Sequence, residues 1–375
     1  MVVTPNKENS NALNLLFIIG LVFCLYILKP IVVPLIIALI LTVSIFPLVN
    51  FLEKKWRANR VISALTAIFA LSIILFGLLA FIVFELTDIL EKSDLYILRL
   101  TEVYNSILSY LDANLGVRKS ELSLKKFNMG ATIKDNFTNI IDFLTSSGSI
   151  FSNIILIPLY IFFFLIYRKF FKSFIFKAFS SDGNVLRVKS VLAKLYKVQQ
   201  NYLYGLFTVM FIVGLLNSLG LLILGIENAF FFGFLAAILL LIPYIGIMIG
   251  SLLPALVALA TKDSAWYAVG VIAVFMFIQM IEGNYITPKI TGSRVSINSF
   301  VAILSIILFS MLWGTAGMIV ALPVIASLKV VFDSIPELKP YGFLIGEPLE
   351  EHLRSDARIR LKNWKKIRKE KINNF

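Results

Sequence analysis

The sequence predicts an all-α protein that crosses a membrane several times. Of its 375 residues, 59% are hydrophobic and only 15% are charged, a more apolar balance than ordinary soluble domains have. Several apolar runs reach about 18 residues or more, the length at which a helix can cross the hydrocarbon core. The runs do not alternate between apolar and polar residues, which argues against a β-barrel. We therefore expect a polytopic helical membrane protein with about eight membrane segments.

The first half of the chain alternates between expected spans and polar segments. Spans are expected at about 13–28, 31–50 and 61–84, and a fourth at about 149–167. The first is interpreted as a retained span, because no small-residue cleavage site follows it. Residues 85–148 mix acidic, basic and apolar positions at helical spacing. This pattern predicts a small helical domain outside the membrane, with a loop near 113–120.

The distribution of basic residues predicts the orientation. Residues 168–200 contain eight Lys and Arg residues against the single acid Asp182. Basic residues collect on cytoplasmic loops, so this segment is placed inside. Counting back along the spans puts residues 85–148 outside and the N-terminus inside. The net charge of +13 is then explained by membrane topology, and no nucleic-acid partner is expected.

We expect both termini in the cytoplasm and the protein in the bacterial inner membrane. A fifth span is expected at about 201–225. The chain then divides into five parts, each named by its residues: N-terminal spans (1–84), the extracytoplasmic helical domain (85–148), span 4 with the basic cytoplasmic segment (149–200), a C-terminal membrane core (201–335) and a basic cytoplasmic tail (336–375).

Two long uncharged segments, 229–260 and 299–332, are interrupted by glycine and proline. As one straight helix, the first would be roughly 48 Å long, against a hydrocarbon core of about 30 Å. Each is either a kinked single span or a hairpin whose backbone lines a cavity, as in transporters with broken helices. The two segments also resemble each other loosely. The candidate break residues are Pro243, Gly246, Gly250, Pro254, Gly314, Gly317 and Pro323.

The stretch QMIEGNYITPKI (279–290) places a carboxylate and amides at the end of an apolar run. A carboxylate in or near a membrane favours a functional site, with Glu282 as proton carrier, cation ligand or partner of a polar solute. The alternative is an interfacial loop in which Glu282 pairs with Lys289 or Arg294. Gln279 lies one turn earlier on the same helix face. The candidate pathway residues are Gln279, Glu282, Gly283, Asn284, Thr287, Pro288, which is expected to fix the exit of the chain, and Asn217, for which helix–helix bonding is the alternative.

Enzyme and metal chemistry have no signature in this sequence. The chain has one cysteine and one histidine, so neither a zinc site nor an internal disulfide is expected. It contains no phosphate-binding G-x-x-x-x-G-K-[ST] motif and no G-x-S-x-G. We expect no cofactor, no metal and no enzyme activity, and any transport would be secondary or depend on a partner.

Three stretches resemble the autoinducer-2 exporter family of PerM-like permeases: residues 32–55, 233–259 and 281–329, including IPYIG and EGNYITPKITG. In these motifs, Pro243 and Gly246 match the family's central break, and Glu282, Gly283, Asn284, Pro288 and Gly292 match its second motif. The resemblance implies a membrane transporter that exports the quorum-sensing signal autoinducer-2 or exchanges Na⁺(Li⁺) for H⁺. It also implies a homo-oligomer, for which a pentamer is one arrangement.

Three functions follow as hypotheses. The leading one is a secondary transporter that exports a small polar solute such as autoinducer-2, with Glu282 between the two broken segments. The second is a Na⁺(Li⁺)/H⁺ antiporter, which the absence of Asp and Glu from 228 to 262 disfavours. The third is a non-transporting scaffold that recruits partners through its outer domain and its tail (350–375).

Overall fold

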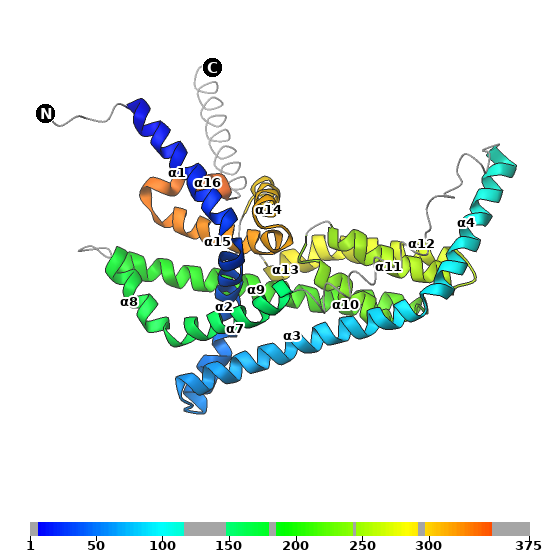
Figure 1. Ribbon diagram of the computed structural model, residues 1–375, viewed down its shortest axis with the longest axis horizontal. Helices are drawn as coiled ribbons and strands as arrows, with labels where there is room; N and C mark the ends of the chain where they lie inside the picture. The colour runs from blue at the N-terminus through cyan, green and yellow to red at the C-terminus, as the bar shows by residue number, and fades with distance from the viewer. Residues whose placement is uncertain (1–6, 116–147, 180–184, 243–244, 292–296, 347–375) are drawn as a thin grey trace, which may run out of the picture. The chain divides into compact units, whose positions relative to one another are not determined.

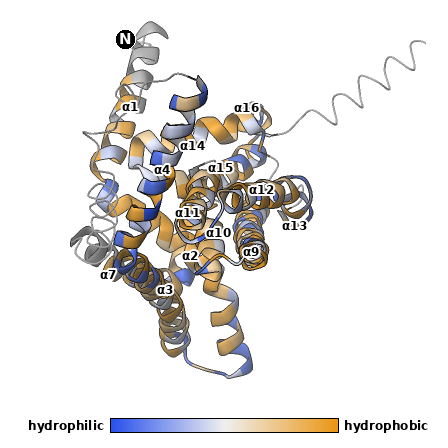
Figure 2. Ribbon diagram, turned by 90° about the vertical axis from the view of Figure 1, so that its right-hand side faces the viewer, coloured by the Kyte–Doolittle hydropathy of each residue, from blue (hydrophilic) through white to orange (hydrophobic). Residues whose placement is uncertain are grey.

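The computed structural model describes residues 7–115, 148–179, 185–242, 245–291 and 297–346. Within these ranges the regular structure is helical, apart from one isolated bridge between Ile297 and Gly346. Five of the described helices are long and apolar enough to cross a membrane, and shorter apolar helices accompany them. Apolar residues dominate α2, α3 and α10 in Figure 2. The expected all-α polytopic class is confirmed.

The first half contains seven of the labelled helices (Figure 1), whose bounds are α1 (Lys7–Ile27), α2 (Lys29–Lys55), α3 (Arg60–Glu91), α4 (Ser93–Leu115), α7 (Gly148–Ile166), α8 (Arg168–Phe179) and α9 (Val185–Ile223). Of these helices, α3 and α9 extend furthest beyond the expected spans. α3 continues to Glu91 instead of ending near 84, and α9 begins at Val185 instead of near 201. No Gly or Pro occurs between residues 185 and 204, and Lys, Arg and Leu are good helix formers, so nothing in the sequence stops α9. Residues 116–120 of the expected loop lie outside the described ranges.

The second half contains α10 (Ala229–Leu239), α11 (Ile245–Thr261), α12 (Trp266–Ile281), a π-helical segment (Glu282–Ile286), α13 (Thr287–Thr291), α14 (Ser299–Trp313), α15 (Thr315–Ser334), a 3₁₀ turn (Pro336–Leu338) and α16 (Lys339–Ile345). The chain forms two compact units: residues 1–173 with 200–292, and residues 174–199 with 293–375. The two interrupted apolar segments belong to different units.

In the first unit, α2, α3 and α7 pack through small residues. Ala38, Ala64 and Ala67 are almost completely buried and form a cluster with Ile161 and Leu165 of α7. Small side chains allow close approach of helix backbones, which drives helix association where lipid surrounds both helices. Arg168, just after α7, donates from Nη2 to Oε2 of Glu53 over 2.5 Å and so ties the ends of α7 and α2 together.

The segment 229–260 is a hairpin. α10 and α11 pack side by side and are joined by residues 240–244. Gly246 approaches the backbone of Leu239, and Gly250 lies against Ala236, so the two arms run antiparallel. A Cβ on Gly250 would lie 2.6 Å from that of Ala236, which is too close for any other residue. The break precedes Gly246, and Pro254 is buried inside α11.

The segment 299–332 is a second hairpin, in the second unit. α14 and α15 meet at Gly314, whose φ of 69° favours glycine. Gly317 packs against the backbone carbonyl of Phe309, and Pro323 lies inside α15. Asn298 caps α14, since its Oδ1 accepts from the backbone N–H of Val301 at 2.8 Å. Its Nδ2 donates to the carbonyl of Leu344 at 2.6 Å, so the start of α14 is held against α16, which follows α15.

Candidate functional site

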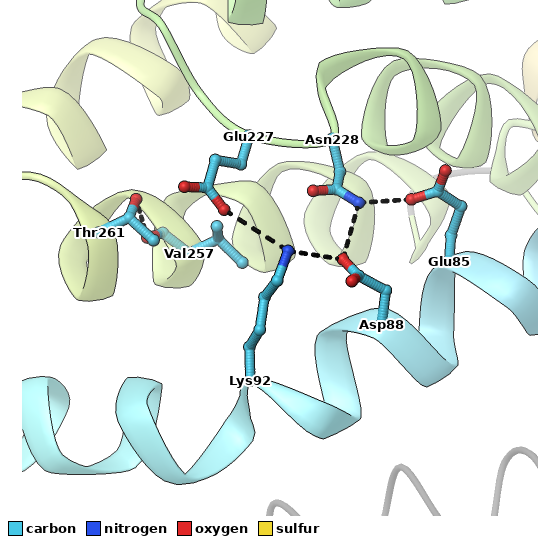
Figure 3. A network of polar contacts seen from close by, with 7 residues as sticks. All are labelled: Glu85, Asp88, Lys92, Glu227, Asn228, Val257 and Thr261. Atoms are coloured by element: carbon cyan, nitrogen blue, oxygen red, sulfur yellow. Dashed lines mark hydrogen bonds and ion pairs between the residues drawn. The ribbon is translucent and has the colours of Figure 1, made fainter.

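The first hairpin begins and ends at the same end of the first unit. Figure 3 shows Glu85 and Asp88 of α3 beside Asn228, which directly precedes α10, with Thr261 of α11 close by. A Cβ on Gly225, in the turn after α9, would lie 3.2 Å from Nζ of Lys262, which follows α11. The hairpin α10–α11 therefore begins and ends at one end of the unit, and residues 209–224 of α9 pack beside it or against α12. For the segment 229–260, the sequence allowed either a kinked single span or a hairpin, and the structure shows the hairpin.

A polar network closes that end of the hairpin (Figure 3). Asn228 takes a left-handed conformation with φ of 53°, and its Nδ2 donates to Oε2 of Glu85 at 2.5 Å. Lys92 pairs with Asp88 at 2.8 Å and reaches Glu227 at 3.9 Å. The hydrogen bond from Lys92 to Asp88 raises the pKa of Lys92 above its usual 10.5. The stabilisation linked to this Lys92 shift is fully present below pH 10.5 and is lost as the pH rises through the raised pKa.

The tip of the hairpin meets α9 and α12 in an apolar cluster. Val209 and Val213 of α9 and Ile278 of α12 form its buried centre, and Leu240, at the end of α10, packs against them. Ile286 and Ile290 join the cluster from the segment after α12. At 1.5 Å per residue, the 11 residues of α10 cover about 16 Å, roughly half of a hydrocarbon core. The tip therefore lies deep in the unit, away from the network of Figure 3.

Glu282 lies beside this cluster and is only 6% exposed. It opens a π-helical segment, Glu282–Ile286, in which the backbone N–H of Thr287 bonds to the carbonyl of Glu282. Nε2 of Gln279 donates to Oε2 of Glu282 at 2.7 Å, and the Thr287 hydroxyl donates to Oε1. Both carboxylate oxygens are therefore held by neutral groups of the same helix. Single π turns inside α-helices are frequent at functional sites.

Asn217 lies on the face of α9 that packs against α12. Gly220 approaches Val274 and Ile278, and Leu224 approaches Gly270, so this face runs antiparallel to α12. Asn217 is one turn beyond Val213 and is 4% exposed, and its Oδ1 has no hydrogen-bond partner among the described residues. Along the interface of these antiparallel helices, Asn217 lies opposite the turn of α12 that contains Ile278. Ile278 is in turn about one helical turn before Glu282. An unsatisfied amide oxygen in an apolar interface is costly, because its surroundings offer it no hydrogen-bond donor.

The structure brings some of the predicted pathway residues together and separates the others. Gln279, Glu282 and Thr287 share one hydrogen-bonded group, and Asn217 faces the same interface from α9. Gly283, Asn284 and Pro288 are exposed, and Nδ2 of Asn284 donates to the Met280 carbonyl of its own helix at 2.8 Å. Pro288 is expected to fix the exit of the chain. In the structure the helix continues past it, since α13 extends to Thr291. Lys289 is exposed, while Pro243 and Arg294 lie outside the described ranges.

Residues 15–337 match the family described as AI-2E family transporter. The chain belongs to the AI-2E transporter family. Among its relatives, YueF of Bacillus subtilis (strain 168) is 26% identical over 367 residues, 89% of this chain and 95% of YueF. The AI-2 transport protein TqsA of Escherichia coli (strain K12) is 25% identical over 311 residues, 81% of this chain and 86% of TqsA. This member of the AI-2E family is accordingly a membrane transporter.

Sequence reasoning missed three features of this AI-2E family protein. The packing of the hairpin tip joins Leu240 to Ile278, 38 positions later in the chain. The network of Figure 3 joins α3 to Glu227 and Asn228, the two residues that directly precede α10. Gln199 donates to the carbonyl of Pro323 and to the Ser327 hydroxyl, each at 2.5 Å. The proline gives no signal for this contact, because a proline in a helix frees the carbonyl four residues before it and not its own.

Proposed function

We propose that this transporter is a secondary transporter that exports a small polar solute along the interface of α9, α12 and the hairpin tip. The observation that supports this most is the buried Glu282, held at a π turn against an apolar cluster that also contains the hairpin tip. A carboxylate inside a membrane segment is costly, which favours a functional reason for its presence. Hairpins that end within the membrane are where transporters bind their solutes.

The chemistry of the site favours a solute that donates hydrogen bonds. Each oxygen of Glu282 accepts one hydrogen bond and has room for a second, since a carboxylate offers about four lone-pair positions. Oδ1 of Asn217 is a further acceptor in the same interface. A small solute with hydroxyl groups would satisfy these acceptors. Autoinducer-2 is such a candidate, and the name of the relative TqsA supports testing it first.

The experiment is efflux from proteoliposomes that contain the purified protein, labelled autoinducer-2 and an internal pH dye. We expect protein-dependent efflux of the label, compared with protein-free liposomes. A sodium-dependent pH change without efflux would overturn the proposal in favour of cation/proton exchange. Silence of both signals, for protein that remains folded in the liposomes, would overturn autoinducer-2 export and favour the scaffold hypothesis.

A further inference from the structure

A cavity of about 570 Å³ lies between α4 and the end of α11, within the first unit. One wall is a face of α4, made by residues three or four positions apart: Arg99, Glu102, Val103, Ser106 and Tyr110. The other wall is made by residues 259–263 and Ala265, where α11 ends and the chain turns into α12. The volume is within the range of small-molecule sites, about 300–1,000 Å³. The cavity is at the base of the hairpin, the end opposite to its tip.

Both walls of this cavity carry one positive and one negative side chain. On α4, Nη1 of Arg99 pairs with Oε2 of Glu102 at 3.1 Å, and both side chains are mostly exposed. On the other wall, Lys262 and Asp263 are neighbours in the chain, and neither forms an ion pair with a described residue. Nζ of Lys262 lies over the ring of Tyr267 at 5.6 Å. The charged residues that line the cavity are therefore two cations and two carboxylates, with no net charge.

This charge balance selects a ligand that carries both signs. A ligand with only negative charge would approach two carboxylates, and a ligand with only positive charge would approach two cations. Like charges brought together are costly, so both kinds of ligand are disfavoured. A zwitterion can place each of its charged groups against an opposite charge of the protein.

Arg99 and Asp263 have hydrogen-bonding capacity that the protein does not use. A guanidinium has five N–H donors, and the pair with Glu102 uses Nη1. Exposed ion pairs of this kind contribute little to stability, so a carboxylate of the ligand can share or replace Glu102. Asp263 is exposed, and its carboxylate accepts no hydrogen bond from the described residues. A cation and a carboxylate on different walls are thus available to one ligand.

We propose that this cavity binds a small zwitterionic amino carboxylate. Its carboxylate contacts Arg99, its ammonium group contacts Asp263, and the apolar side chains of Val103 and Leu259 contact the carbon chain between them. The proposal is independent of the solute pathway at Glu282, because the cavity lies at the other end of the hairpin and its test measures binding instead of efflux.

The test is equilibrium binding of radiolabelled 4-aminobutyrate to the purified full-length protein in detergent. Unlabelled 4-aminobutyrate, butyrate and butylamine serve as competitors, since they share a four-carbon skeleton and differ in charge. We expect saturable binding, with 4-aminobutyrate competing at least about tenfold more strongly than the two singly charged compounds. A lack of saturable binding, or equal competition by all three compounds, would overturn the proposal.

Variants of the cavity test where the solute binds. Asp263→Asn and Arg99→Gln should each weaken binding about tenfold, because each removes one of the two charge contacts. Asp112→Asn is the matched control, since it removes an exposed carboxylate of α4 that does not line the cavity. Ser106→Phe fills space at the α4 wall from an exposed position and should abolish binding at an unchanged thermal midpoint. Equal losses in Asp263→Asn and Asp112→Asn, or full binding to Ser106→Phe, would contradict binding in this cavity.

Discussion

Gln279 of α12 and Glu282, one turn later at the start of the π-helical segment, form a hydrogen-bonded pair with 2.7 Å between Nε2 and Oε2. The pair fixes one oxygen of a carboxylate that is almost completely buried, and the hydroxyl of Thr287 fixes the other. The orientation of Glu282 is therefore set by its own helix and does not depend on a solute.

The first prediction concerns this pair. Gln279→Met removes the donor at similar size and leaves Oε2 of Glu282 without its partner. We expect the free energy of unfolding in detergent to fall by about 1–3 kcal/mol, the cost of a buried group that loses its hydrogen bond. Adding Glu282→Gln, which removes the charge, should recover part of this loss without restoring efflux. An unchanged unfolding midpoint for Gln279→Met would show that the bond does not contribute.

The close approach of the hairpin arms gives the second prediction. Gly250→Ala places a Cβ 2.6 Å from that of Ala236, so α10 and α11 must separate. We expect a loss of about 1–3 kcal/mol, as for overpacked cores. Gly77→Ala is the matched control, because a Cβ there meets nothing within 4 Å. This control should stabilise α3 by up to about 1 kcal/mol. Equal effects of the two variants on the thermal midpoint would contradict tight packing of the hairpin.

The third prediction separates backbone from side chain at Asn228. Its φ of 53° suits glycine, and its Nδ2 bonds to Glu85. Asn228→Gly should lose only the hydrogen bond, at about 1–2 kcal/mol for a partly exposed charged acceptor. Asn228→Ala should lose about 1–2 kcal/mol more, because a Cβ disfavours the left-handed conformation. Chemical denaturation measures both, and an Ala variant as stable as the Gly variant would be inconsistent with the strained turn.

The ion pair of Arg168 and Glu53 supports the fourth prediction. Their side chains are 24% and 18% exposed. Arg168→Leu leaves the Glu53 carboxylate without its cation and should cost about 2–3 kcal/mol, less than for a fully buried pair. The double variant Arg168→Leu with Glu53→Leu should be more stable than Arg168→Leu alone, since no lone charge remains. Additive losses in this double-mutant cycle would refute a direct interaction.

Part of this structure could be predicted from the sequence. Apolar length gave the helical class, and the spacing of Gln279 and Glu282 placed both on one face. The positions of the breaks were less predictable. Pro254 and Pro323 are buried inside helices, whereas one hairpin changes direction between Leu239 and Ile245 and the other at Gly314. A proline in a helix can be accommodated by packing, so its presence does not locate a turn.

The π turn and the long-range contacts could not be predicted. A π segment adds one residue to a helical turn. In the five residues EGNYI, this change produces no spacing of apolar residues that would distinguish it from an α-helix. The contact of Asn228 with Glu85 joins positions 143 residues apart, and that of Leu240 with Ile278 depends on where the hairpin ends. Both contacts follow from tertiary packing, and the pattern of residues in a single sequence does not show which distant positions pack together.

Efflux of labelled autoinducer-2 from proteoliposomes, compared among wild type, Glu282→Gln and Glu227→Gln, tests the role of Glu282 most directly. Glu227 is the matched control, because its side chain is 55% exposed and lies at the other end of the hairpin. The site geometry predicts at least about a tenfold lower initial rate for Glu282→Gln, equivalent to 1.4 kcal/mol of lost interaction, and a near-normal rate for Glu227→Gln. Equal rates for all three proteins would contradict a solute pathway past Glu282.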